Sequence, residues 1–146
     1  MGLLNFKKKT ENEAAWKVYQ DKLGDKLLSV RVNTKYAHDL YSHTYYVQIK
    51  YCQNETNELP SKEFLQEVAQ IEDKLLKVIE KVFEDNIAYL GSATFGGSSY
   101  LTFASNLDVK WKDFIESQFE NTVEAGCYMN DNMGYYNQVL YPDFIR

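Results

Sequence analysis

One long stretch, residues 61–103, constrains the fold of this chain more than any other. Its first part carries apolar residues at steps of three and four with charged residues between them, which is typical of an amphipathic helix. The apolar stripe comprises Phe64, Leu65, Val68, Ile71, Leu75, Val78, Ile79, Val82 and Phe83. From Ile87 the period drops to two, and Gly96-Gly97 separates two such runs. We therefore predict a helix from Ser61 to about Asp85 that covers one face of an antiparallel sheet.

The rest of the chain predicts shorter elements. Residues 11–23 favour a helix, because Trp16 and Tyr19 are three apart and Gly24 is a helix stop signal. The other predicted elements are strands at 27–32, 44–51 and 126–129, a helix at 108–123 and a terminal helical turn through Tyr136 and Leu140, ended by Pro142. This order predicts an α+β fold, a two-layer ferredoxin-like sandwich with an antiparallel sheet and helices on one face.

Length and charge limit the domain count and the class of partner. With 146 residues and a net charge of −5, the chain suits one α+β domain, residues 11–146, preceded by a flexible tail, residues 1–10. Acidic residues outnumber basic ones beyond residue 50, which argues against nucleic-acid binding. No apolar run approaches the roughly 20 residues that span a bilayer, and no signal peptide is visible, so we expect no membrane association and a cytoplasmic location.

Catalytic and metal-binding patterns are weak. His38 and His43 are the only histidines, and with Asp39 they form the one candidate set for a small hydrolase or a metal-dependent enzyme. No third strong ligand and no nucleophile motif accompany them, so we expect loop histidines, no enzyme activity, no metal and no cofactor. We expect Cys52 and Cys127 to be reduced and to pack as small apolar side chains.

Three motifs carry a resemblance to a known family. They are Trp16-x-x-Tyr19, then Tyr89-x-Gly91-x-x-Thr94-x-x-Gly97 followed by Tyr100 and Phe103, and finally Tyr136-x-x-x-Leu140-Tyr141-Pro142. Over most of its length the chain resembles the bacterial family catalogued as domain of unknown function 695, which is similar in layout to the regulator of ribonuclease activity B. The resemblance implies a ferredoxin-like fold and a role in regulation by protein binding. None of the three motifs is a catalytic signature.

Surface recognition is the function that the composition favours. Twelve tyrosines are many for this length, and tyrosine buries its ring while its hydroxyl stays accessible. The predicted contact surface combines aromatic and acidic residues, namely Trp111, Glu116, Glu120, Glu124, Asp131, Tyr135, Tyr136 and Tyr141. An acidic ring around aromatic anchors favours a basic protein partner. We therefore predict a non-catalytic protein-binding or regulatory module, a monomer or weak homodimer, with an immunity protein that neutralises a bacterial toxin as the alternative.

Overall fold

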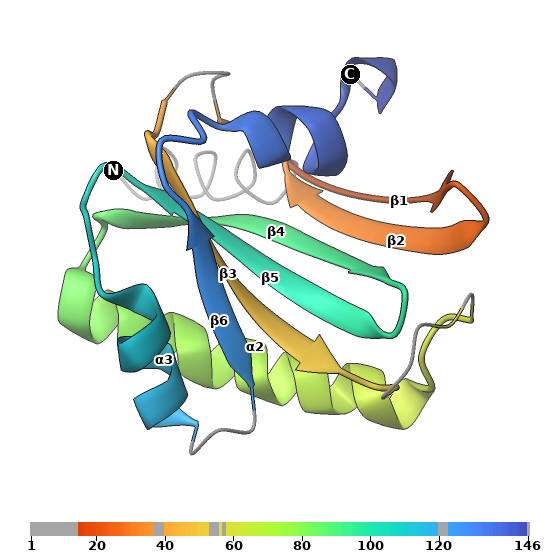
Figure 1. Cartoon of the computed structure of the whole chain (residues 1–146), viewed down its shortest axis with the longest axis horizontal. Helices are drawn as coiled ribbons and strands as arrows, with labels where there is room; N and C mark the ends of the chain where they lie inside the picture. Colours follow the sequence, from red (N-terminus) through yellow and green to blue (C-terminus); the bar gives the residue numbers. More distant parts are fainter. Residues whose placement is uncertain (1–14, 37–39, 53–55, 57, 120–122, 146) are drawn as a thin grey trace, which may run out of the picture.

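The structure, a computed structural model, describes residues 15–36, 40–52, 56, 58–119 and 123–145. Six strands in these ranges form one antiparallel sheet in the order β1-β2-β4-β5-β3-β6. They are β1 (Trp16–Leu23), β2 (Lys26–Asn33), β3 (His43–Lys50), β4 (Ile87–Phe95), β5 (Ser98–Ser105) and β6 (Glu124–Tyr128). Figure 1 shows helices α2 (Lys62–Phe83) and α3 (Trp111–Gln118) against one face of this sheet. The predicted α+β class and two-layer sandwich are confirmed.

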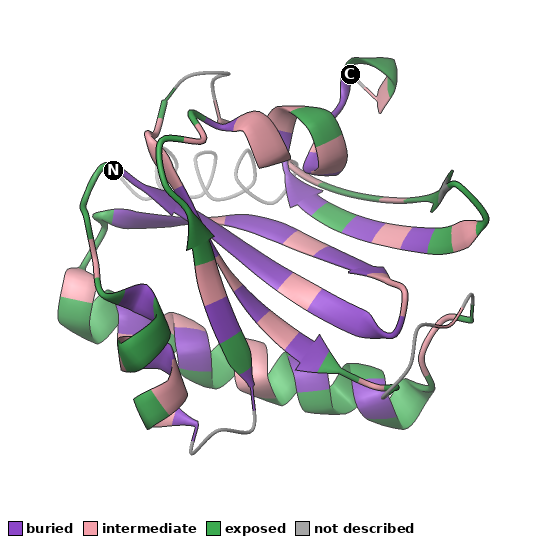
Figure 2. Ribbon diagram, viewed as in Figure 1, coloured by how far each residue is buried: buried purple, intermediate pink, exposed green. Residues whose placement is uncertain are grey.

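Helix α2 forms because its apolar stripe is buried on the sheet. The side chain of Ser61 caps its first turn by accepting a hydrogen bond of 3.2 Å from the Phe64 N–H, as an N-cap serine does. Its buried residues Phe64, Val68, Leu75 and Ile79 belong to one apolar core with residues of β3 and β5. Figure 2 shows buried and exposed positions alternating along this helix. No described helix is both long and apolar enough to cross a membrane.

Among the described residues, only half of the opposite face of the sheet is covered by other elements. The short helix η1 (Tyr136–Leu140) lies there, followed by the 3-10 turn η2 (Asp143–Ile145). Tyr136 and Leu140 are fully buried with apolar residues of β2 and β4, and the Tyr136 hydroxyl donates a 2.6 Å hydrogen bond to the carbonyl oxygen of Asn33. The predicted terminal helical turn is therefore present. We call the remaining half of this face, over β5, β3 and β6, the open face.

The predicted helix at residues 11–23 is wrong where the structure describes it, because residues 16–23 form strand β1. This strand pairs with β2 in a hairpin whose last pair is Leu23 and Lys26, so Gly24 and Asp25 form a two-residue turn. Gly24 has φ of +66°, the conformation such a turn requires. The glycine that was interpreted as a helix stop therefore turns a hairpin. The predicted helix at 108–123 is also shorter than expected, since α3 ends at Gln118.

The central glycine motif has a structural explanation. Gly91 sits at a β-bulge in β4 with φ of +142°, and a β-carbon there would overlap the carbonyl oxygen of Arg31 on β2. Thr94 and Ser99 share a buried hydrogen bond of 2.9 Å between their hydroxyls, next to the turn at Gly96 and Gly97. The motif therefore shapes the sheet.

Candidate functional site

Two of the predicted contact residues are packing residues. Trp111 is 1% exposed, and its indole Nε1 donates a 2.9 Å hydrogen bond to the Tyr46 carbonyl oxygen beneath the helical layer. Tyr136 is fully buried on the other face of the sheet. Neither side chain is accessible to a partner, so the candidate surface does not include them. Tyr141 is half-buried, and its ring packs against Tyr136 with centroids 6.0 Å apart.

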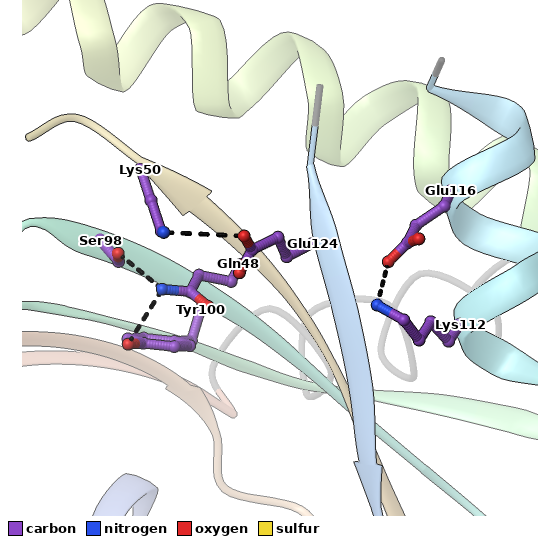
Figure 3. A network of polar contacts seen from close by, with 7 residues as sticks. All are labelled: Gln48, Lys50, Ser98, Tyr100, Lys112, Glu116 and Glu124. Carbon is purple, nitrogen blue, oxygen red and sulfur yellow. Dashed lines mark hydrogen bonds and ion pairs between the residues drawn. The ribbon is translucent and has the colours of Figure 1, made fainter. Parts of the chain in front are cut away.

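The predicted acidic ring is partly neutralised by lysines. Figure 3 shows Glu116 of α3 paired with Lys112 at 2.5 Å and Glu124 of β6 paired with Lys50 of β3 at 3.6 Å. The hydrogen bond from Lys112 lowers the pKa of the Glu116 carboxyl. Glu120 lies outside the described residues. The predicted charge ring is therefore reduced to two exposed ion pairs, which are typically weak.

Asp131 organises the turn that follows β6. One of its carboxylate oxygens accepts hydrogen bonds from the Thr44 hydroxyl at 2.9 Å and from the backbone N–H of Tyr135 at 2.8 Å. In the same turn Asn130, Asn132 and Met133 have positive φ values of 56°, 51° and 67°, and Met133 is fully buried. Such backbone conformations persist only where the surroundings hold them. Asp131 therefore fixes the position of Tyr135 relative to β3.

A small aromatic pocket opens on the open face. Its volume is about 120 Å³, and we call it the open-face pocket; its lining residues are Tyr46, Phe95, Tyr100, Thr102, Tyr128 and Tyr135. The rings form a connected series, with centroids of Phe95 and Tyr100 5.1 Å apart and those of Tyr128 and Tyr135 6.2 Å apart. Tyr46 joins the two pairs, at 6.3 Å from Tyr100 and 5.4 Å from Tyr128. Five aromatic side chains from separate strands and turns therefore converge on one cavity.

The pocket exists because small residues lie beside Tyr46. In the sheet register Tyr46 is opposite Thr102 of β5 and Gly126 of β6, and Thr102 is opposite Gly91 of β4. A β-carbon at Gly126 would lie 2.6 Å from Cζ of Tyr46, so the tyrosine ring occupies the space above the glycine. Tyr46 and the buried Thr102 opposite it both line the open-face pocket.

Thr102, one of the residues that line this cavity, has an unusual polar atom. It is 1% exposed, and its hydroxyl Oγ1 is the one buried side-chain oxygen or nitrogen of the described residues that has no hydrogen-bond partner. Leaving such a group unpaired costs free energy, so native proteins rarely tolerate it without a reason. A bound group that hydrogen-bonds Oγ1 would remove this cost.

The hydroxyls of Tyr128 and Tyr135 at the pocket have raised pKa values and are neutral at physiological pH. Burial raises the pKa of Tyr135, with smaller effects from its tyrosine neighbours. Burial also raises the pKa of Tyr128, to which Tyr46 and the Asp131 carboxylate contribute. At the pocket's outer side Gln48 donates hydrogen bonds to the hydroxyls of Ser98 at 2.9 Å and Tyr100 at 3.4 Å, as Figure 3 shows. The pocket is thus aromatic, uncharged and fixed at its rim.

The predicted histidine set is not brought together in the described structure. His38 and Asp39 lie outside the described residues. His43 begins β3 rather than standing in a loop, is half-buried, and accepts a 3.0 Å hydrogen bond at Nδ1 from the backbone N–H of Asn130. The described residues contain no cluster of three or more His, Cys, Asp or Glu side chains placed to hold a metal.

The cysteine prediction was half right. Cys52 and Cys127 are free thiols, as predicted, but both are exposed, so the expectation that they pack as buried apolar side chains is wrong. Cys127 lies on β6, one of the two edge strands of the sheet, and Cys52 follows the end of β3.

Most residues of the open-face pocket were not predicted as site residues. Only Tyr135 belongs to the predicted set. One signal was present in the sequence, because the alternation in residues 44–51 places Tyr46 and Gln48 on one side of their strand and Tyr45 and Val47 on the other. The pairing of Tyr46 with Thr102 and Gly126 depends on strand order, which the local pattern does not contain.

Comparison with known proteins agrees with the resemblance drawn from the motifs. Searches of curated proteins and of solved structures gave no significant match. A protein-family model matches residues 14–141, a range that includes all six strands, both long helices and η1. The chain belongs to the family of unknown function DUF695.

Proposed function

We propose that this protein is a non-catalytic binding module that docks a protein partner on its open face. One observation above all supports the proposal: Tyr128 is 49% exposed on the open face, beside four further aromatic side chains that line the same pocket. Tyrosine is enriched at protein interfaces because a rigid ring supplies contact area and its hydroxyl tolerates water. The neighbouring Met129 is also 41% exposed, which extends the apolar area past the end of β6.

The charge of the molecule favours a basic partner. The chain has a net charge of −5. Asp131 lies in the turn that follows β6, and its two hydrogen-bond donors are uncharged. Complementary charges of this kind steer encounter and select partners more than they add affinity.

The hydrogen bonding of the polar side chains near the open face supports a non-catalytic role. Asp131 and His43, the acidic and basic groups nearest the turn after β6, both act as acceptors of backbone hydrogen bonds that hold the turn in place. Thr102 has no acid or base bonded to its hydroxyl, so nothing activates it as a nucleophile. We assign these side chains structural and binding roles.

Affinity capture with paired variants tests the proposal. The immobilised protein is compared with Tyr128→Ala on the open face and with Leu65→Ala on α2, since both residues are 49% exposed. A specific partner is expected to be captured by the wild type and by Leu65→Ala but lost with Tyr128→Ala. Capture that survives Tyr128→Ala and fails with Leu65→Ala would place the interface on the helical layer instead.

A further inference from the structure

The open-face pocket has a size that limits its occupant. At about 120 Å³ it is somewhat smaller than cavities of about 150 Å³ that hold benzene. It therefore suits a group of about four to six heavy atoms, such as the end of one side chain. Five aromatic rings line it together with Thr102, whose buried hydroxyl has no hydrogen-bond partner.

The chemistry of the walls disfavours an anion. The face of an aromatic ring carries negative electrostatic potential, so it repels a carboxylate or phosphate and attracts a cation. Asp131 adds a formal negative charge close to Tyr128. The lysines that flank this face, Lys50 and Lys112, are each paired with a glutamate, so their charges are compensated locally.

A purely apolar occupant is also a poor match. An aliphatic side chain would exclude water from the pocket and leave the Thr102 hydroxyl buried without a partner, which retains the cost of an unmade hydrogen bond. An occupant that suits the aromatic walls and also pairs with the Thr102 hydroxyl carries a positive charge on a flat, weakly hydrated group. It also has an N–H to donate to Oγ1. Among protein side chains the guanidinium of arginine has these properties, whereas the lysine ammonium is compact and strongly hydrated.

We infer that the open-face pocket receives the guanidinium group of an arginine side chain on the protein partner, with its face against the tyrosine rings and an N–H donated to Thr102. This inference rests on the proposed binding function and gives it a chemical specificity. Tyr46, Tyr100 and Tyr128 supply ring faces, and Thr102 supplies the acceptor. Asp131 is a positioning residue, because it holds the backbone of Tyr135 at the pocket's edge.

Titration with single-residue mimics tests the inference without the natural partner. The intact protein, with isotope-labelled tyrosine rings, is titrated by NMR with Nα-acetyl-arginine methylamide and with the citrulline analogue, which has the same shape but no charge. The arginine mimic is expected to give saturable shifts at Tyr46, Tyr100 and Tyr128, and the citrulline mimic to bind at least about fivefold more weakly. The lysine mimic and tetramethylammonium are run in parallel.

Two threonine variants separate hydrogen bonding from general effects on the fold. Thr102→Val keeps the shape of the side chain and removes Oγ1, so affinity for the arginine mimic should fall at least about tenfold, as for loss of a hydrogen bond from a charged donor. Thr94→Val is the matched control, because Thr94 is buried on the adjacent strand but its hydroxyl already pairs with Ser99. Should either threonine variant fail to fold, Tyr128→Leu at a half-exposed position removes one ring face instead.

Each contrary result of these experiments would contradict a different part of the inference. Equal binding of the arginine and citrulline mimics would overturn the role of charge, and binding of tetramethylammonium or lysine in place of arginine would overturn the choice of guanidinium. Absence of any saturable shift would overturn the pocket's assignment altogether. These failures concern the pocket alone, whereas the proposed docking function fails only when open-face variants leave partner capture unchanged.

Discussion

The ring of Tyr46 lies over Gly126 on the neighbouring strand, in space that any larger residue at position 126 would fill. The two residues are opposite each other in the register of β3 and β6. With its ring over Gly126, Tyr46 lines the open-face pocket together with Thr102, which lies opposite it on β5. A glycine on an edge strand thus creates the pocket on which the proposed function depends.

Replacing this glycine should close or distort the pocket. In Gly126→Ala the new methyl group overlaps the Tyr46 ring, and we expect a loss of about 1–3 kcal/mol in the free energy of unfolding, the usual cost of overpacking. Chemical denaturation measures the loss, and NMR of the Tyr46 ring reports its displacement. In Gly24→Ala the positive φ should also lower stability, but nothing lies near the new methyl group, so the Tyr46 ring should stay in place. An unmoved Tyr46 ring in Gly126→Ala would contradict this account.

The unpaired hydroxyl of Thr102 should cost the protein stability. Thr102→Val removes a buried oxygen without a partner, so we expect the free energy of unfolding to rise by about 1–2 kcal/mol. Thr94→Val breaks the hydrogen bond to Ser99 and should lower it by about 1–3 kcal/mol. Equilibrium unfolding in denaturant compares the two. A destabilised Thr102→Val protein would mean that the hydroxyl already has a partner in the free protein.

The helical layer should depend on Leu75. This side chain is fully buried at the centre of α2, so Leu75→Ala should lower the free energy of unfolding by about 2–5 kcal/mol. Leu65→Ala on the same helix should change it by less than about 0.5 kcal/mol, since Leu65 is 49% exposed. Similar losses in the two variants would show that the stripe does not pack as described.

Alkaline pH should weaken the attachment of the C-terminal segment. The Tyr19 hydroxyl donates hydrogen bonds of 2.9 Å to the carbonyl oxygens of Val139 and Leu140, and burial, with a smaller effect of Asp21, raises its pKa to about 12. The unfolded chain ionises near pH 10, so the contribution of Tyr19 is complete below pH 10 and is lost as pH rises to about 12.

The variant Tyr19→Phe isolates that contribution. It should be less stable than the wild type at neutral pH, and its stability should fall less steeply between about pH 10 and pH 12. Thermal unfolding across this range provides the measurement. Parallel declines in the two proteins would assign the alkaline sensitivity to other tyrosines, such as Tyr36, whose pKa burial also raises to about 12.

The fold was predictable where one periodic pattern of apolar residues was long enough to exclude other secondary structures. The stripe of α2 extends over six turns, and both its N-cap at Ser61 and the strands after it were predicted correctly. Strand β1 was missed because Trp16 and Tyr19, three residues apart, fit a helix as well as a strand. They in fact lie on opposite faces, with Trp16 against Tyr89 and Tyr19 under η1. The Gly24-Asp25 pair was the sequence signal for a hairpin.

The candidate site was less predictable than the fold because strand order assembles it. The sequence indicated an aromatic and acidic surface, but it could not separate buried Trp111 and Tyr136 from accessible Tyr128. Tyr46, Thr102 and Gly126 are distant in sequence and meet only because β3 lies between β5 and β6. The lack of a hydrogen-bond partner for the Thr102 hydroxyl likewise depends on tertiary packing, and no local sequence pattern predicts it.

The most direct test of the account maps a partner onto the tyrosines themselves. The chain contains twelve of them, placed on both layers, so 3-fluorotyrosine labelling and ¹⁹F NMR report on the open face and on internal controls in one spectrum. On addition of the captured partner, the resonances of Tyr46, Tyr100 and Tyr128 should shift, whereas those of Tyr45 and Tyr89 beneath the helical layer should not. Shifts confined to the tyrosines of the helical layer, with Tyr128 unchanged, would contradict docking on the open face.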